Sequence, residues 1–165
     1  MEDIAFAPHE IRVGNGILAI SPMPGRTRHY HTDWPALLVW EPDLVISLTD
    51  MAELVRKGSA SLGDDLAQAG IGWLHLPIAD FGVPSDWDWP PLASDLLDRL
   101  AKGQRILVHC FGGCGRSGML VLRLMIAAGE PADAALARLR KVRPCAVETP
   151  EQMEWATQDA PPGRS

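Results

Sequence analysis

The sequence predicts a single α/β domain whose mostly parallel central sheet is flanked by helices on both faces. Short apolar runs rich in β-branched residues alternate with segments of helical periodicity, and turn residues separate the two. The chain has 165 residues, of which 47% are apolar and 22% charged, which suits one hydrophobic core. We therefore expect one compact domain over residues 1–159, followed by a frayed tail at 160–165.

Three strands and two helices are expected in the first half of the chain. Apolar runs bounded by turn residues predict the strands: Ile17–Ile20, Leu44–Leu48 and Trp73–Ile78. Residues 61–70 have the pattern of a short helix, and the ambiguous stretch Leu37–Trp40 is interpreted as another. Loops are expected over the basic stretch Arg26–His31 and over Asp80–Pro84.

The second half has a clearer pattern, in which one strand lies among helices. Helical periodicity predicts four helices: Pro90–Lys102, Met119–Ala128, Pro131–Val142 and a last one from Pro150. The apolar run Arg105–His109 predicts a buried strand, and a glycine-rich turn follows it. Ligands of parallel sheets bind at the carboxyl ends of the strands, so this turn is the expected site.

The charge pattern argues against several classes of function. The net charge is −6, from 21 acidic and 15 basic residues, and no stripe of lysine and arginine runs along the chain. Such a domain is a poor candidate for binding DNA, RNA or anionic membranes. We expect a monomer that holds an anion at one local site.

The N-terminal residues and the cysteines favour a cytoplasmic location. Residues 1–10 carry acids before any apolar run, which does not fit a secretory signal. No uncharged apolar stretch reaches the roughly 18 residues of a membrane span. Three cysteines, Cys110, Cys114 and Cys145, are too few for a disulfide-stapled secreted fold, and their number is odd.

Residues 109–118 read HCFGGCGRSG and carry the most specific chemistry of the chain. The glycines free the backbone to curl, so that successive N–H groups can form a nest for a tetrahedral dianion. The following helix, expected to begin at or just after Arg116, points its positive end at the same place. The candidate phosphate-binding residues form the turn itself: Phe111, Gly112, Gly113, Cys114, Gly115 and Arg116.

Three side chains at this nest suggest a reaction. The positive field favours the thiolate form of Cys110, a nucleophile for in-line attack on phosphorus. Arg116 has the planar fork that holds two phosphate oxygens at once, and Ser117 is placed to donate a hydrogen bond to the sulfur. The alternative is a buried structural cysteine beside a serine that caps a helix.

The stretch 109–117, His-Cys-x5-Arg-Ser, resembles the signature of the cysteine-based protein tyrosine and dual-specificity phosphatases. Leu76–Pro84 is similar to the general-acid loop of that family, and Ala146–Gln152 to the segment that positions the hydrolytic water. With Ile17–Gly25 in front, the resemblance covers roughly residues 15–157 and is nearest to the kinase-associated phosphatase branch. It implies a metal-independent phosphatase without a cofactor, which works through a cysteinyl-phosphate intermediate.

The reaction also needs an acid, because a phenolate or alkoxide leaves poorly unless it is protonated. The resemblance assigns this role to Asp80, in a loop bounded by glycine and proline. Chemistry alone leaves Asp86 and Asp88 open as alternatives. An aspartate before Phe81 and a glycine also suits a turn cap.

Four further residues have roles that the resemblance implies or puts in doubt. It implies that His109 is a neutral hydrogen-bonding support for the loop and that Gln152 helps to position the water. Glu148 stands where the family usually has glutamine, and we expect its side chain to face away from the site. Cys114 is unusual in this loop: it is either a small residue tolerated in a tight turn or the partner of Cys110 in a reversible, protective disulfide.

The substrate is less well defined than the reaction. The interval between Cys110 and Arg116 carries no charge, which favours a singly phosphorylated substrate. We expect phosphotyrosine in proteins, with phosphoserine and phosphothreonine left open, and the basic stretch Arg26–His31 is either a rim that meets acidic phosphopeptides or a solvated loop. The alternatives are a small phosphate ester or an RNA end as substrate, a phospho-binding module without turnover, and a rhodanese-like sulfurtransferase.

Overall fold

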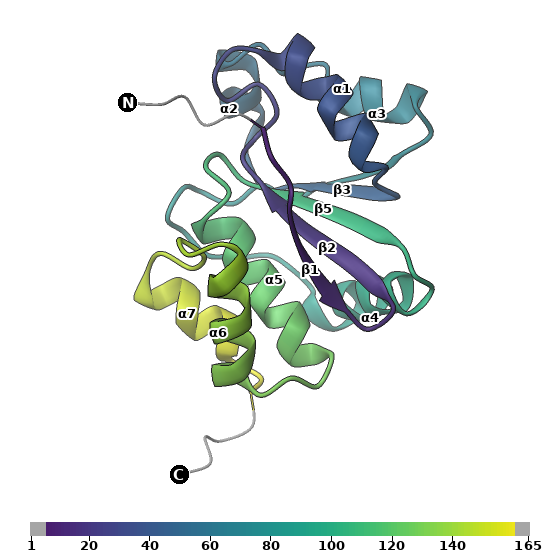
Figure 1. Cartoon of the computed structure of the whole chain (residues 1–165). Coiled ribbons are helices and arrows are strands. Elements are labelled where there is room, and N and C mark those ends of the chain that lie inside the picture. Colours follow the sequence, from purple (N-terminus) through teal and green to yellow (C-terminus); the bar gives the residue numbers. More distant parts are fainter. Residues whose placement is uncertain (1–5, 161–165) are drawn as a thin grey trace.

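A five-stranded, mostly parallel sheet forms the centre of the protein in a computed structural model, which describes residues 6–160 (Figure 1). The strands are β1 (His9–Val13), β2 (Gly16–Ser21), β3 (Leu44–Ser47), β4 (Gly72–His75) and β5 (Arg105–His109). Their order is β1-β2-β5-β3-β4; β1 pairs antiparallel with β2, and the other pairs are parallel. The predicted α/β class is confirmed. Residues 1–5, within the acidic start, and 161–165, most of the predicted frayed tail, lie outside the described residues.

Helices cover both faces of this sheet, as predicted (Figure 1). The helices on one face are α1 (Tyr30–Trp40), α2 (Met51–Arg56) and α3 (Leu62–Gln68). Those on the other are α4 (Trp89–Ala101), α5 (Gly115–Ala127), α6 (Ala132–Val142) and α7 (Pro150–Thr157). Strand side chains alternate between the two cores: Ile106 and Val108 of β5 face the α4–α7 side, and Leu107 faces the α1–α3 side. No helix within residues 6–160 is long and apolar enough to cross a membrane.

Every predicted helix and strand is present, and three of them have a bound that differs by three residues or more. Helix α1 begins at Tyr30, so it takes over the end of the predicted basic loop. Helix α5 begins at Gly115, one turn before Met119, because the glycines of the turn lead straight into it. Strand β4 ends at His75 rather than Ile78, where the chain leaves the sheet.

Two short elements escaped the sequence analysis. Strand β1 has only five residues, and only Ile11 and Val13 turn inward, so its apolar signal is weak. Helix α2 has six residues and is set by its start: Asp50 accepts from the Glu53 N–H at 2.7 Å, and the Glu53 carboxylate accepts from the Asp50 N–H at 3.1 Å. This capping box begins the helix without a long apolar face.

The place of β5 between β2 and β3 positions the site. His109, the last residue of β5, pairs with Ser21 of β2 and with Ser47 of β3. The carboxyl ends of three parallel strands therefore meet immediately before Cys110. This is the edge of a parallel sheet at which ligands bind.

Candidate active site

Residues 110–116, here called the phosphate loop, run from the end of β5 into the first two residues of α5. Gly113 adopts φ +74°, and a Cβ there would lie 2.7 Å from the carbonyl carbon of Ser21, so this position requires glycine. On the outer side of the loop, Arg143 donates to the carbonyl oxygens of Gly112 and Gly113, both at 2.9 Å. With these carbonyls turned outward, the Gly113 and Cys114 N–H groups face inward, where the thirteen-residue α5 also begins. The loop is thus an anion cradle.

Cys110 lies at the base of this cradle, as the sequence predicts. It is a free thiol and only 3% exposed. Ser117, on the first turn of α5, places Oγ 3.2 Å from the Cys110 Sγ. A hydroxyl at that distance can donate to a sulfur that carries negative charge.

Arg116 is fully enclosed by the protein, at 1% exposure. Its Nη1 donates to Glu53 Oε1 and to the Ile78 carbonyl, both at 2.9 Å, and its Nη2 donates to Glu53 Oε2 at 3.0 Å. The Nε is buried and has no hydrogen-bond partner among the described residues. The edge of the guanidinium formed by Nη1 and Nη2 is therefore occupied. The edge that carries Nε remains for binding two phosphate oxygens, as the sequence predicts.

Glu53 is one functional residue that sequence reasoning missed. Burial alone would raise its pKa, but the hydrogen bonds from Arg116 and the Asp50 N–H outweigh it and hold the pKa below the usual range. In the same way, the bond to Glu53 and the charge of Cys110 outweigh the burial of Arg116 and raise the arginine pKa. Both groups are charged at neutral pH. The spacing Asp50-x-x-Glu53 was the available signal, but it identifies a helix start and not a partner for Arg116.

Asp80 is the predicted acid that approaches the cradle. Its Oδ1 lies 3.5 Å from Arg116 Nη2, and its side chain is 56% exposed. The same Oδ1 accepts from the Phe81 N–H at 3.0 Å, so the alternative turn contact is present together with the site contact. Of the three candidate acids, Asp86 and Asp88 form no ion pair with Arg116 in the described part of the chain, and Asp88 is the residue before α4.

His109 is completely buried beneath the phosphate loop. The Cys110 carbonyl can only accept, so His109 Nδ1, which lies 3.3 Å from it, carries the hydrogen and donates. In a neutral ring Nε2 is then an acceptor, and the Ser47 hydroxyl, which accepts from Trp73 Nε1 at 2.8 Å, donates to it. Burial lowers the pKa of His109 to about 4, so the ring is neutral at pH 7. This is the state that the resemblance implied for this residue.

Gln152 connects the last helix to the loop that carries Asp80. It is fully buried; its Oε1 accepts from the Glu148 N–H at 2.9 Å, and its Nε2 donates to the Gly82 carbonyl at 3.2 Å. Glu148 does not face away as expected, because its Oε1 lies 2.5 Å from where a Cβ on Gly115 would be. The α6–α7 connection runs along the phosphate loop, which brings this carboxylate beside the start of α5.

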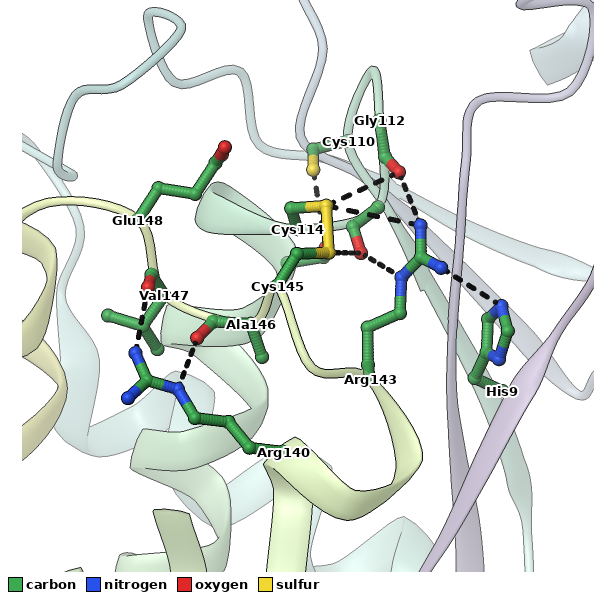
Figure 2. Close-up of a disulfide and its surroundings, with 12 residues drawn as sticks. His9, Cys110, Gly112, Cys114, Arg140, Arg143, Cys145, Ala146, Val147 and Glu148 are labelled. Atoms are coloured by element: carbon green, nitrogen blue, oxygen red, sulfur yellow. Dashed lines mark hydrogen bonds between the residues drawn. A yellow bond between two sulfur atoms is a disulfide. The ribbon is translucent and has the colours of Figure 1, made fainter. Parts of the chain in front are cut away.

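Cys114 is disulfide-bonded, but not to Cys110 (Figure 2). It pairs with Cys145, whose Cα lies 5.1 Å away, and Cys110 remains free. The pairing between Cys110 and Cys114 considered from the sequence is therefore not the one formed. The physical reason is that Arg143 binds the outer carbonyls of the loop and brings Cys145 to that side.

Two basic side chains stand over Phe111, the residue after the cysteine. Arg26 places Cζ 5.2 Å from the ring centroid, and Lys57 places Nζ 5.6 Å from it. Neither forms an ion pair with a described residue, and Arg26 Nε is buried without a partner. The sequence analysis proposed Arg26 for the rim and missed Lys57, which follows the unpredicted α2.

These residues can hold a tetrahedral dianion against a thiol, with a carboxylic acid nearby. Within residues 6–160, no group of three or more His, Cys, Asp or Glu side chains is arranged to hold a metal ion. The fold and the cradle define the class: cysteine phosphatases of the protein tyrosine and dual-specificity type. The family model described as "Polymorphic toxin system, DSP-PTPase phosphatase" matches residues 24–130, and the chain belongs to this family.

Solved structures share the fold. A kinase associated phosphatase with serine in place of its catalytic-site cysteine has a TM-score of 0.81 and 22% identity, over 95% of both chains. The structure of "Tk-PTP in the active form" has a TM-score of 0.69 and 34% identity, over 86% of this chain and 89% of that chain. The resemblance to tyrosine and dual-specificity phosphatases predicted from the sequence is confirmed.

Curated relatives match over a shorter range. Human cyclin-dependent kinase inhibitor 3 is 34% identical over 74 residues, which are 45% of this chain and 35% of that protein. The uncharacterized protein MJECL20 of Methanocaldococcus jannaschii is 33% identical over 87 residues, 52% of this chain and 57% of that protein. The chain thus spans less than two thirds of the length of these relatives.

Proposed function

We propose that this chain is a cysteine-dependent phosphomonoester hydrolase that acts on phosphotyrosine in proteins and, in second place, on phosphoserine and phosphothreonine. The observation that carries the proposal is the position of Cys110. Its sulfur lies at the base of the cradle, 3.2 Å from the Ser117 hydroxyl, and the buried Nε of Arg116 has no partner among the described residues. An anionic tetrahedral group completes both sets of contacts.

The first step transfers the phosphoryl group to sulfur. The Cys110 thiolate attacks phosphorus in line, a sulfur–phosphorus bond forms, and the bond from phosphorus to the ester oxygen breaks. Asp80 gives its proton to the departing oxygen, so a neutral phenol or alcohol leaves. Arg116 and the loop N–H groups hold the charge on the transferring oxygens.

The second step returns the free enzyme. A water molecule attacks phosphorus and gives its proton to the Asp80 carboxylate, while the sulfur–phosphorus bond breaks. Ser117 donates to the leaving Cys110 sulfur, and inorganic phosphate is released. Gln152 orders the segment beside the site where this water would lie, through its bonds to Glu148 and Gly82.

A protein substrate fits the rim of the site. Arg26 and Lys57 present positive charge beside Phe111, where acidic residues that flank a phosphorylated side chain can meet them. The interval from Cys110 to Arg116 adds no charge for a second phosphate. We further propose a monomer in the cytoplasm, without nucleic-acid or membrane binding, because the net charge is −6 and the nucleophile must stay a free thiol.

The first test is hydrolysis of p-nitrophenyl phosphate in the presence of a metal chelator, with Cys110 verified as a free thiol by mass spectrometry. Wild type should release phosphate, and Cys110→Ser should not. Phosphotyrosine and phosphoserine peptides of one sequence then rank the substrates by kcat/KM. If folded wild type releases phosphate from none of these substrates, the proposal is wrong. Binding of the same phosphopeptides would then support the phospho-binding alternative, and transfer of sulfur from thiosulfate to cyanide the sulfurtransferase.

A further inference from the structure

The outer side of the phosphate loop is held by the connection between α6 and α7 (Figure 2). The Arg143 guanidinium donates through Nε to the Gly113 carbonyl and through Nη2 to the Gly112 carbonyl, both at 2.9 Å. Two residues further along, Cys145 is bonded covalently to Cys114. The next contact is the Val147 N–H, which donates to the Cys114 carbonyl at 3.3 Å.

These contacts fix the direction of two peptide units. In a trans peptide, the carbonyl and the N–H of the following residue point in opposite directions. Holding the Gly112 and Gly113 carbonyls outward therefore holds the Gly113 and Cys114 N–H groups inward, toward the anion. The loop needs this support, because glycine populates many backbone conformations and a side chain at Gly112 would meet nothing within 4 Å.

Arg143 is also held from the side that faces away from the phosphate loop, by a contact with β1, and this contact fixes its guanidinium against the loop. Its Nη1 lies 3.3 Å from His9 Nε2 on β1. Burial and the charge of Arg143 lower the pKa of His9, which keeps the ring neutral and its nitrogen available as an acceptor. The guanidinium thus joins β1 to two carbonyls of the phosphate loop.

We propose that Arg143 and the Cys114–Cys145 disulfide form an outer clamp that holds the phosphate loop in its anion-binding shape, and that reduction of this disulfide lowers the activity. The inference rests on the proposed phosphatase function and adds its regulation. Arg143 is a positioning residue, and the disulfide is the reducible part of the clamp. With this clamp, the enzyme is more active when Cys114 and Cys145 form their disulfide and Cys110 is a free thiol.

The solvent exposure of each cysteine determines which sulfur a reductant attacks first. Cys145 is exposed, Cys114 is half-buried, and Cys110 is 3% exposed. A dithiol attacks Cys145 Sγ as its thiolate, and Cys114 leaves as a thiolate. The second thiol of the reductant then releases Cys145, so two thiols form on the protein and the dithiol becomes a disulfide. A reducing compartment favours the two thiols, and therefore the less active state of the enzyme.

The clamp also protects the nucleophile. While Cys114 is bonded to Cys145, it cannot form a disulfide with Cys110, which lies four positions before it in the chain. All three cysteines of the sequence are then accounted for: two in the clamp and one free thiol.

The test compares oxidised wild type, wild type reduced with a dithiol, Cys145→Ser and Arg143→Gln. The matched control is Arg140→Gln, because Arg140 donates to the Ala146 and Val147 carbonyls of the same connection and not to the phosphate loop. The readouts are kcat and KM for p-nitrophenyl phosphate, the affinity for tungstate by calorimetry, and the rate of Cys110 alkylation by iodoacetamide. Mass spectrometry assigns the alkylated cysteine, and circular dichroism checks the fold.

We expect reduction, Cys145→Ser and Arg143→Gln each to lower kcat/KM and tungstate affinity by about 10-fold. The reason is that the Gly113 and Cys114 N–H groups are then no longer held toward the anion. Cys145→Ser, once Cys110 is verified as a free thiol, should no longer respond to the dithiol, and Arg140→Gln should behave as wild type. Equal kcat/KM and tungstate affinity in oxidised wild type, reduced wild type and Cys145→Ser would overturn the clamp. If wild type shows no turnover but reduction still weakens tungstate binding, the proposed function fails and the clamp stands.

Discussion

Both oxygens of the Glu53 carboxylate face the guanidinium of Arg116: Oε1 lies 2.9 Å from Nη1, and Oε2 lies 3.0 Å from Nη2. The pair is buried and belongs to different parts of the fold, α2 and the start of α5. A fork held in this way does not have to reorganise when an anion arrives, which is the condition for strong electrostatic stabilisation. Glu53 acts on the substrate only through Arg116.

Replacement of this carboxylate should therefore weaken both the site and the fold. We expect Glu53→Gln to lower kcat/KM for p-nitrophenyl phosphate by at least about 10-fold, since the Arg116 guanidinium is no longer held in the orientation that binds phosphate. The free energy of unfolding should fall by about 3 kcal/mol, because a buried charge is left without its partner. Urea denaturation and steady-state kinetics measure the two effects, with the exposed Glu154→Gln as control. Unchanged kcat/KM in Glu53→Gln would show that Arg116 does not need this partner.

Asp80→Asn should affect substrates according to their leaving groups. The amide cannot give a proton, so esters of weakly acidic alcohols should lose about 100-fold or more in kcat. An activated aryl phosphate needs little protonation and should lose far less. A series of aryl phosphates of graded leaving-group pKa, assayed on wild type, Asp80→Asn and the control Asp86→Asn, measures this difference. A uniform loss across the series, or a larger effect of Asp86→Asn, would contradict the assignment.

The buried neutral His109 makes stability fall in acid. Its pKa is about 4 in the folded protein, against 6.5 for an ordinary histidine, so below pH 6.5 the unfolded chain binds a proton that the native state refuses. Stability is therefore lost as the pH falls from 6.5 to 4, by about 3 kcal/mol in all. Burial also lowers the pKa of His9, which adds a loss of the same sign.

Urea denaturation between pH 7 and pH 5 tests this directly. His109→Asn should be less stable than wild type at pH 7 but should have a shallower pH dependence. His31→Asn, at an exposed position, should keep the wild-type slope. An identical slope for His109→Asn and wild type would contradict the role given to this ring.

The cations over Phe111 should select substrates rather than assist the reaction. We expect Arg26→Gln and Lys57→Gln each to raise KM several-fold for a phosphotyrosine peptide with acidic flanks, since each removes one charge contact of about 0.2–1 kcal/mol or somewhat more. For p-nitrophenyl phosphate, kcat should stay unchanged. Lys102→Gln, at an exposed position after α4, is the control. Equal losses on acidic and neutral peptides would exclude a rim that reads flanking charge.

Sequence reasoning succeeded where the information is local. The apolar run Arg105–His109 and the glycines after it specify a buried strand, a tight turn and a helix start, and β5 has the predicted bounds. The positions of Cys110, Arg116 and Ser117 follow from that one turn. Their roles remain predictions until turnover is measured.

It failed where the fold joins distant segments. Glu53 is 63 positions from Arg116, and nothing in its own helix marks it as a partner. Three cysteines allow three pairings, and the choice of Cys145 depends on how the α6–α7 connection packs against the phosphate loop. Glu148 was expected to face away from the site, and nothing in its own segment indicates that its carboxylate lies beside Gly115. Such contacts depend on tertiary packing, which periodicity does not encode.

The bond from Gln152 Nε2 to the Gly82 carbonyl has a consequence for the order in which the protein matures on the ribosome. The cysteine, serine and arginine of the cradle are all synthesised by residue 117. The support for the acid loop comes from α7, and the outer clamp from the connection before it, so both leave the exit tunnel after the cradle. A nascent chain thus carries Cys110 well before it carries the contacts that hold the phosphate loop and the acid loop, and under the proposed function we expect activity only after α7 has docked.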